Sequence, residues 1–225
     1  MKKCILGLIG SLVVLVSAAQ PKERPFQKDI DAFVRQDSLQ APPDLPVLLV
    51  GSSSFTFWKD AQAAFPNYKI LNRGFGGSSL TDLIYFAPQV LFAYHPSQII
   101  IYCGENDMAA TPAAAPKEVL ARFKTLFRMI RRKWSEVPVI YVSIKPSPAR
   151  WQLEPQFVEA NRRISAYLHH KKKAVFLDVH THMLDSLGNT RPELYISDRL
   201  HMNQEGYKIW KNLLLPLLGA REGGQ

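Results

Sequence analysis

Short runs of consecutive apolar residues alternate along the chain with longer stretches in which apolar residues recur at helical spacing. Continuous apolarity, rather than alternation with polar residues, is typical of parallel strands that are covered on both faces. The runs that show this pattern, and that we expect to be strands, are Val47–Val50, Tyr68–Leu71, Gln98–Tyr102, Val137–Val142 and Ala174–Leu177.

The stretches between these runs predict helices. They are Leu80–Ala93, Pro116–Trp134, Glu154–His170 and Gln204–Leu218, and a further amphipathic segment, Phe26–Leu39, precedes the first run. Regular alternation of strands and helices predicts an α/β fold. We expect a three-layer α/β/α, flavodoxin-like sandwich with a parallel sheet of about five strands joined by right-handed crossovers.

The first residues have the pattern of a secretory signal peptide. Lys2 and Lys3 precede an uncharged apolar run, Cys4–Val16, and small residues follow it up to Ala19, after which we expect cleavage. The alternative is a membrane anchor, but a helix of this length spans about 20 Å, short of the roughly 30 Å hydrocarbon core. We therefore expect a secreted or periplasmic protein. Its segments would be 1–19 as signal peptide, 20–45 as an N-terminal helical extension and 46–225 as one α/β domain.

The composition is that of a folded domain. Of 225 residues, 47% are hydrophobic and 21% charged, which excludes disordered, collagen-like and coiled-coil chains. The net charge is +9, and cleavage would remove two lysines and leave +7. The remaining excess lies in clusters at expected helix surfaces, Arg131–Lys133, Arg162-Arg163 and Lys171–Lys173. These clusters are typical of a solvated surface; attraction to an anionic polymer is the alternative. Without interleaved aromatic residues they predict no nucleic-acid partner.

Small and polar residues follow every expected strand. In an open parallel sheet, ligands bind outside the carboxyl ends of the strands. The segments there are Gly51–Ser54, Asn72–Gly77, Gly104–Asp107, Ser143–Pro148 and, before the last helix, Ser197–Asn203. We therefore expect the functional site at this edge of the sheet.

These segments hold the groups that hydrolytic acyl transfer needs, namely a nucleophile, a base, a group that orients the base, and oxyanion donors. A turn could aim Asp198 at Nδ1 of His201, with Nε2 facing the serines after the first strand. Gly77 leaves a backbone N–H unshielded, and Asn106 offers a side-chain amide. Taken alone, the serines could instead cap a helix and bind an anion, and Asp198 and His201 could be a surface pair.

Four blocks, in order, resemble those of the SGNH (GDSL-like) hydrolases, and together they span Val47 to Tyr207. The blocks are VLLVGSSSFTFW, LNRGFGGSS, CGENDM and SDRLHMNQEGY. Two positions depart from the family pattern: Ser52 replaces the Asp that usually precedes the nucleophile, and Ser78 replaces an Asp often found after the oxyanion glycine. Neither position carries the core chemistry, but the loss of both carboxylates weakens inference of the substrate from relatives.

The resemblance implies a role for each matching residue. Ser53 would be the nucleophile, His201 its base and Asp198 the group that orients the imidazole. The N–H groups of Ser53 and Gly77 and the Asn106 amide would hold the oxyanion. The Gly-x-Ser-x-Gly elbow of the α/β-hydrolases is absent from the sequence, which argues against that class.

We therefore expect a secreted serine esterase that removes short acyl groups, such as acetyl, from a carbohydrate or another small ester. The alternative is a non-catalytic binding module on the same fold that contacts an anionic polymer through the basic helices. We expect no cofactor, no metal ion and no stable membrane insertion.

Three further groups of residues have either an undecided role or an expected structural role. Asp178, His180 and His182 are spaced as metal ligands could be, although no further ligand cluster accompanies them, so we expect a structural role. Trp58 and Trp151 could each wall the substrate pocket or pack in the core or its rim. Asn203 is placed as the N-cap of the last helix.

Overall fold

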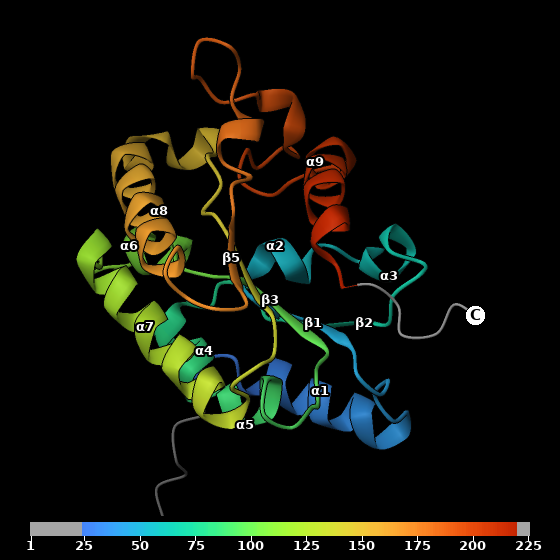
Figure 1. Cartoon of the computed structure of the whole chain (residues 1–225). Coiled ribbons are helices and arrows are strands. Elements are labelled where there is room, and N and C mark those ends of the chain that lie inside the picture. The colour runs from blue at the N-terminus through green and yellow to red at the C-terminus, as the bar shows by residue number, and fades with distance from the viewer. Residues whose placement is uncertain (1–23, 220–225) are drawn as a thin grey trace, which may run out of the picture.

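The structure, a computed structural model, describes residues 24–219 and has a five-stranded parallel sheet at its centre (Figure 1). The strands are β1 (Val47–Gly51), β2 (Ile70–Gly74), β3 (Gln98–Tyr102), β4 (Val139–Val142) and β5 (Ala174–Leu177). Their order in the sheet is β2-β1-β3-β4-β5, and every neighbouring pair is parallel. Helices cover both faces, so the predicted three-layer α/β/α class is confirmed.

Alternate residues of each central strand enter two separate cores. In β1, Leu48 and Val50 pack into one cluster, and Val47 and Leu49 pack into the other. This division follows from the two-residue period of a strand and explains why the whole run has to be apolar. Helices α1 (Gln27–Leu39), α4 (Leu80–Tyr85), α5 (Ala87–Val90), α7 (Pro116–Lys133) and α8 (Glu154–Leu168) cover the first face. Helices α2 (Ser53–Thr56), α3 (Ala61–Ala64) and α9 (Gln204–Leu214) cover the second.

The remaining short elements lie in the connections. They are α6 (Glu105–Ala109) and the 3₁₀ turns η1 (Pro148–Leu153), η2 (Thr181–Met183), η3 (Pro192–Leu194) and η4 (Leu215–Leu217). The short helices α2 and α6 begin directly after β1 and β3, where the sequence places its candidate site residues.

Helix α7 shows how the sequence sets an element's limits. Pro116 occupies its first turn, where no N–H is needed, and the Glu118 carboxylate accepts a hydrogen bond from the Ala115 N–H at 2.7 Å. One face buries apolar side chains, among them Phe123 and Ile130, each of which contributes about 1.5–3 kcal/mol. The last turn is basic, which suits the helix dipole and the solvent.

The predicted single helix Leu80–Ala93 is wrong, because the segment forms two helices, α4 and α5, with a break at Phe86 (Figure 1). Pro88 lies in the first turn of α5 and has no N–H to donate to the carbonyl of Ile84, so one continuous helix cannot run through this position. The strand β5 also differs from expectation. It lies at the sheet edge, and Val175 is 40% exposed rather than covered.

Helix α1 belongs to the same core as the sheet. Its Ile30 is buried in the same apolar cluster as residues of β1 and β3, and its Asp37 pairs with the buried Arg73 of β2. Tyr94 joins this pair: its hydroxyl donates to Asp37 at 2.6 Å and accepts from Arg73 Nε at 2.6 Å. The pairing explains why β2 continues through an arginine that an apolar pattern would exclude.

The predicted signal peptide, residues 1–19, lies outside the described residues. Between residues 24 and 219, no helix combines the length and apolarity that a bilayer crossing demands.

Candidate active site

The carboxyl end of β1 brings Ser53 to the edge of the sheet. Gly51, the last residue of β1, has φ 138°, and a Cβ there would lie 1.9 Å from the Tyr102 carbonyl oxygen on β3. Only glycine allows the two strands to remain this close while the chain turns. Ser52 follows in extended conformation, and Ser53 is the first residue of α2. The turn therefore places the Ser53 side chain above the strand ends.

Three side chains from two distant parts of the sequence form a hydrogen-bonded chain at this edge. His201 Nε2 lies 3.0 Å from Ser53 Oγ, and His201 Nδ1 lies 2.6 Å from Asp198 Oδ2. The other carboxylate oxygen, Asp198 Oδ1, accepts hydrogen bonds from the backbone N–H groups of Leu200 and His201, both at 2.9 Å. The structure thus brings together the serine, imidazole and carboxylate that the sequence singles out.

The segment that carries His201 is held at both ends. Arg199 adopts a positive φ of 59°, which reverses the chain between Asp198 and His201. Asn203 caps α9 by accepting hydrogen bonds from the N–H groups of Glu205 and Gly206, which confirms its predicted role as N-cap. The Phe57 ring lies against the imidazole, with centroids 4.3 Å apart. These contacts limit the positions that the ring can adopt.

The hydrogen bonds to Asp198 keep its carboxyl group ionised. Desolvation raises the pKa, but the hydrogen bonds from the His201 ring and from the backbone N–H groups of His201 and Leu200 outweigh it. The result lowers the pKa of Asp198 to about 2. The carboxylate can therefore keep a proton on Nδ1 and leave Nε2 as the proton acceptor toward Ser53.

Two backbone N–H groups at this edge of the sheet are available to an oxyanion. Within residues 24–219, neither the Ser53 nor the Gly77 N–H donates a hydrogen bond. Gly77 has φ 85°, a conformation that L-residues with a side chain rarely adopt. Unclaimed N–H groups are uncommon in a folded chain, and a pair beside a nucleophile suits a tetrahedral intermediate.

The Asn106 amide lies at the same edge, at the beginning of the short helix α6. Its Nδ2 donates to Ser52 Oγ at 2.7 Å and to the Ser78 carbonyl at 3.0 Å. Its Oδ1 accepts from Arg150 Nη1 at 3.0 Å. Ser52, the residue that departs from the family pattern, therefore contacts the amide through a hydroxyl where relatives would have a carboxylate.

A buried residue of α6, Asp107, fixes the loop that carries Gly77 and Ser78. Asp107 Oδ2 accepts from the Leu80 N–H at 2.9 Å, at the first residue of α4. Its Oδ1 accepts from Arg122 of α7 at 2.7 Å. This carboxylate ties the start of α4 to α6, so the Gly77 and Asn106 segments keep a fixed relation.

A buried charged cluster that no sequence motif indicated lies next to Asn106. The Glu105 carboxylate lies 2.8 Å from Arg150 Nη1 and 3.3 Å from Lys145 Nζ, and it accepts a hydrogen bond from the Tyr102 hydroxyl. Desolvation raises the pKa of Glu105, but the charges of Lys145 and Arg150 lower it below its ordinary range. Desolvation lowers the pKa of the buried Lys145. The only signal in the sequence was the position of Glu105 and Lys145 after strands.

The other candidates take no part in this hydrogen-bonded chain. Trp58 is buried and stacked on Tyr207, so it packs in the core rather than lining a pocket. Trp151 is 37% exposed on η1. His180 is buried, with Nε2 2.6 Å from Glu154 Oε1. Among residues 24–219 no three His, Cys, Asp or Glu side chains gather as metal ligands would.

Comparison with known proteins finds a family and a set of solved structures. The model of the GDSL-like lipase/acylhydrolase family matches residues 37–209. A search of curated proteins finds no match to the sequence.

The solved structures include a candidate platelet activating factor from Streptococcus pneumoniae, which is 20% identical with a TM-score of 0.75 and covers 86% of this chain and 92% of its own. A GDSL-like lipase from Bacteroides thetaiotaomicron is 20% identical with a TM-score of 0.71, over 84% and 96% of the two chains. An acetyl-xylooligosaccharide esterase from Geobacillus stearothermophilus is 16% identical with a TM-score of 0.63, over 82% and 99%. At these identities the likeness shows the fold alone.

Proposed function

Since the chain belongs to the GDSL-like lipase/acylhydrolase family and is an ester hydrolase, we propose that it is a secreted serine esterase acting through Ser53, His201 and Asp198. Its substrates would carry short acyl groups, such as acetyl, on a carbohydrate or another small ester. The signal-peptide pattern of residues 1–19 supports export, since the basic start, the apolar run and the small-residue cleavage site of such a peptide are all present.

One observation carries this proposal: the unbroken chain from Ser53 Oγ through the imidazole to the Asp198 carboxylate. Its two distances, 3.0 and 2.6 Å, are hydrogen-bond lengths that proton transfer requires. A binding module would have no need for a hydroxyl and an imidazole in this relation. The adjoining unclaimed N–H groups of Ser53 and Gly77 add the electrostatic half of the mechanism.

In the first half of the reaction, His201 Nε2 takes the proton of Ser53 as Oγ forms a bond to the ester carbonyl carbon. The negative charge on the former carbonyl oxygen is held by the Ser53 and Gly77 N–H groups. The Asn106 amide contributes by sharing a hydrogen now directed at Ser52 or Ser78. Collapse of this intermediate breaks the bond to the alcohol oxygen, which receives the proton from His201. The acyl group remains on Ser53.

In the second half, a water molecule replaces the alcohol. His201 takes a proton from this water as the water oxygen attacks the acyl carbon, and the same donors hold the oxyanion. The bond to Ser53 Oγ then breaks and the proton returns to Oγ. Asp198 remains ionised throughout, because the low pKa of its carboxyl group disfavours proton uptake.

A short acyl group is supported by the kind of enzyme found on this fold. One structural neighbour is an acetyl-xylooligosaccharide esterase, and another is an acetyl esterase solved with an acetate ion. An acetyl group is small and needs only a small binding pocket, which agrees with a site at the exposed ends of strands.

The test compares Ser53→Ala with Ser38→Ala, a control at an exposed serine of α1. Hydrolysis of p-nitrophenyl acetate, butyrate and octanoate is measured, together with labelling by a fluorophosphonate. We expect Ser53→Ala to lose labelling and to lower kcat about 10³-fold or more, with acetate the preferred substrate of the parent. Wild-type turnover by Ser53→Ala would exclude this nucleophile, and preference for octanoate would exclude the short-acyl assignment.

A further inference from the structure

The guanidinium of Arg150 touches the far end of the oxyanion amide. Arg150 Nη1 lies 3.0 Å from Asn106 Oδ1 and 2.8 Å from Glu105 Oε1. One nitrogen thus bridges two consecutive residues of α6, a buried carboxylate and the amide whose Nδ2 donates to Ser52 and Ser78. Arg150 itself comes from η1, more than forty residues further along the chain.

Arg150 is held in place by buried partners rather than by solvent. Its side chain is 21% exposed, and Glu105, its counter-ion, is 6% exposed and receives further contacts from Lys145 and Tyr102. Because Glu105 cannot turn away, the guanidinium cannot either. The backbone of η1 is anchored as well: the Ala149 N–H donates to the carbonyl of Arg199 at 3.0 Å, in the segment that carries the proposed base.

The hydrogen-bond pattern around Asn106 fixes which way its amide points. Arg150 is a donor only, so it accepts no hydrogen and has to face Oδ1. On the opposite side, the Ser78 carbonyl is an acceptor and has to face Nδ2. During catalysis, however, Nδ2 has to share a hydrogen with the oxyanion, which weakens its bond to Ser78 or Ser52. At that moment the contact at Oδ1, together with the remaining Nδ2 bond, keeps the amide from rotating.

We infer that Arg150 is a positioning residue for the oxyanion hole: it holds Asn106 Oδ1 so that Nδ2 stays directed at the developing negative charge. This inference rests on the proposed function of the site. A charged donor on Oδ1 also polarises the amide, and a polarised amide is a stronger donor at nitrogen. Both effects grow as charge forms on the substrate oxygen, so Arg150 acts on the transition state more than on the bound ester.

The experiment measures kcat and KM for p-nitrophenyl acetate in Arg150→Met, Asn106→Ala and the double variant. Arg150→Met removes the donor but leaves Glu105 paired with Lys145 and Tyr102, so no buried carboxylate loses every partner. We expect Arg150→Met to lower kcat about 10-fold or more while KM changes less than twofold, since an oxyanion interaction acts mainly after binding. Asn106→Ala should lower kcat about 100-fold.

The double variant separates positioning from general support of the fold. If Arg150 works through Asn106, Arg150→Met should lower kcat by less than about twofold when Asn106 is already Ala, because the two losses overlap. Arg150→Lys retains the charge but not the planar geometry, and should recover part of kcat. Arg162→Met, which removes an exposed arginine of the surface pair with Glu159, is the matched control and should leave kcat unchanged.

The inference would be overturned if kcat of the double variant fell by the product of the two single decreases, or if kcat of Arg150→Met were unchanged. Thermal unfolding of each variant shows whether loss of activity follows loss of folded protein, and rates are compared only between folded samples. Failure of the proposed function is distinguishable, since it appears as retained activity and labelling in Ser53→Ala whatever Arg150 does.

Discussion

Two glycines near the carboxyl ends of β1 and β2 serve the site through different physical constraints. At Gly51, a Cβ would collide with the backbone of β3, at 1.9 Å from the Tyr102 carbonyl oxygen. At Gly77, a Cβ would meet only the Phe26 ring, at 3.6 Å, and the constraint is the positive φ of 85°. The first glycine therefore permits the close approach of β1 and β3, and the second permits the left-handed turn after β2.

This difference predicts that Gly77→Ala harms activity more than stability. The left-handed conformation costs a residue with a side chain about 1–2 kcal/mol. A shift of the N–H away from the oxyanion removes a donor, which should lower kcat about 10-fold or more. Comparison of kcat with the thermal unfolding midpoint checks this. Gly51→Ala is the contrast and should yield little folded protein, whereas wild-type kcat in Gly77→Ala would remove this N–H from the mechanism.

Asp198→Asn should leave the geometry in place and remove most of the turnover. An amide can donate as well as accept, so it no longer holds a proton on His201 Nδ1 and the imidazole loses its productive tautomer. We expect kcat to fall about 10³-fold, with KM within a factor of about two. Steady-state kinetics on p-nitrophenyl acetate measures this, and a loss confined to KM would contradict the orienting role.

The same carboxylate predicts a pH dependence of stability. Its pKa in the folded protein is about 2, below the ordinary value of about 3.9, so the folded state favours the ionised form. The stability gained is fully present above about pH 4 and is lost as the pH falls toward 2. The difference in unfolding midpoint between the parent and Asp198→Asn should therefore shrink between pH 5 and pH 2. A difference that stays constant would show that Asp198 is not stabilised as a carboxylate.

The site residues that lie in short blocks directly after strands could be identified from the sequence alone. Ser53, Gly77 and Asn106 follow β1, β2 and β3, and parallel topology gathers such positions at one edge. Arg150 could not be reached in this way. Its contact with Asn106 depends on the path of η1, and a surface arginine and a site arginine look alike in sequence.

At the scale of elements, helix α1 is joined to the sheet by a buried polar contact as well as by apolar packing. Arg73 is 3% exposed, and its charge is balanced by Asp37 from α1. Desolvation and the hydrogen bond to Asp37 raise the pKa of Tyr94 to about 12, so its hydroxyl remains a donor at neutral pH. The three side chains connect α1, β2 and the segment before β3.

Asp37→Ala should therefore destabilise the whole domain and not only α1. It leaves a buried guanidinium without its counter-ion, which costs about 3 kcal/mol or more. The control is Asp31→Ala, which removes an exposed carboxylate of the same helix that accepts a hydrogen bond from Gln27, and it should change stability by about 0.5 kcal/mol or less. Urea unfolding measures both. Equal effects of the two substitutions would show that the buried pair does not anchor α1.

Apolar periodicity located the long elements and misjudged those whose limits depend on backbone chemistry. The pattern over 80–93 remains helical through Pro88, although the missing N–H breaks the helix. The apolar pattern predicted that the second strand ends at Leu71. In the structure β2 continues to Gly74, because Asp37 forms an ion pair with the buried Arg73. In both cases the decisive partner is a single hydrogen-bonding group, which a hydrophobic pattern does not register.

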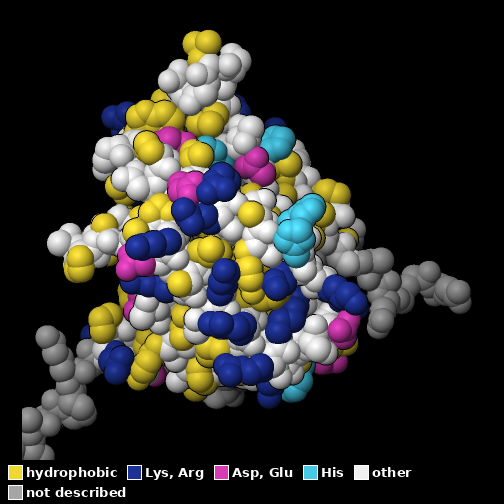
Figure 2. Space-filling model, turned by 60° about the vertical axis from the view of Figure 1, so that its left-hand side comes forward, with side chains coloured by type: hydrophobic (Ala, Val, Ile, Leu, Met, Phe, Trp, Pro, Cys, Tyr) yellow, Lys and Arg dark blue, Asp and Glu magenta, His cyan; other side chains and the backbone are white. Residues whose placement is uncertain are grey.

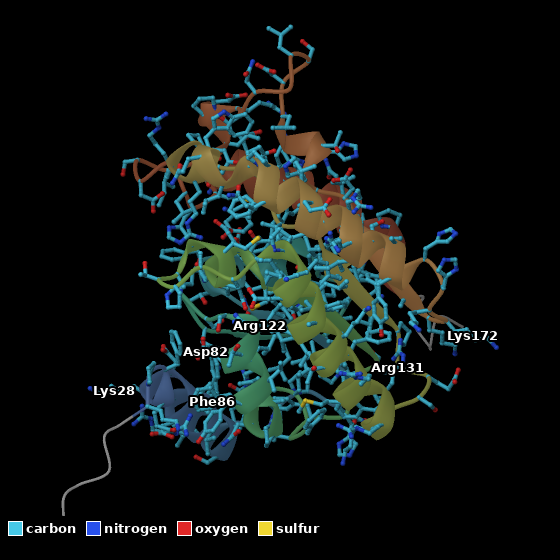
Figure 3. All side chains as sticks on the ribbon, turned by 90° about the vertical axis from the view of Figure 1, so that its left-hand side faces the viewer. Lys28, Asp82, Phe86, Arg122, Arg131 and Lys172 are labelled. Carbon is cyan, nitrogen blue, oxygen red and sulfur yellow. The ribbon has the colours of Figure 1, made fainter. Side chains whose placement is uncertain are left out.

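At the scale of the whole molecule, the site and the main basic surface lie at opposite ends of the sheet. The site occupies the edge where strands end. Helix α7 finishes before β4 begins and α8 before β5 begins, so the basic residues at their ends lie where strands start. Figure 2 shows Lys and Arg side chains gathered on one face, and Figure 3 labels Arg131 and Lys172 there. We call the exposed residues Arg128, Arg132, Lys133 and Lys171–Lys173 the basic face.

Part of this charge has a structural explanation. Arg131 donates to the carbonyl oxygens of Val137, Lys172 and Lys173, and so ties α7 to the chain that enters β4 and β5. Arg128 and Arg132, with Arg131 and Thr125, line a surface hollow of about 550 Å³. Substitution of the exposed members only, leaving Arg131 intact, therefore changes the charge without removing the tie.

The separation predicts that charge and catalysis can be altered independently. A triple variant with Arg128, Arg132 and Lys172 changed to Gln should keep kcat for the neutral ester p-nitrophenyl acetate within about twofold. At 0.15 M salt, screening limits the range over which a surface charge acts to about 8 Å. It should elute from a dextran-sulfate column at lower salt than the parent. The control variant changes Lys59, Lys69 and Lys208, exposed lysines outside the basic face. If both variants elute at the same salt concentration, net charge alone determines binding to the polymer. If the parent binds the polymer tightly but hydrolyses no ester and is not labelled by the fluorophosphonate, the binding-module alternative replaces the esterase.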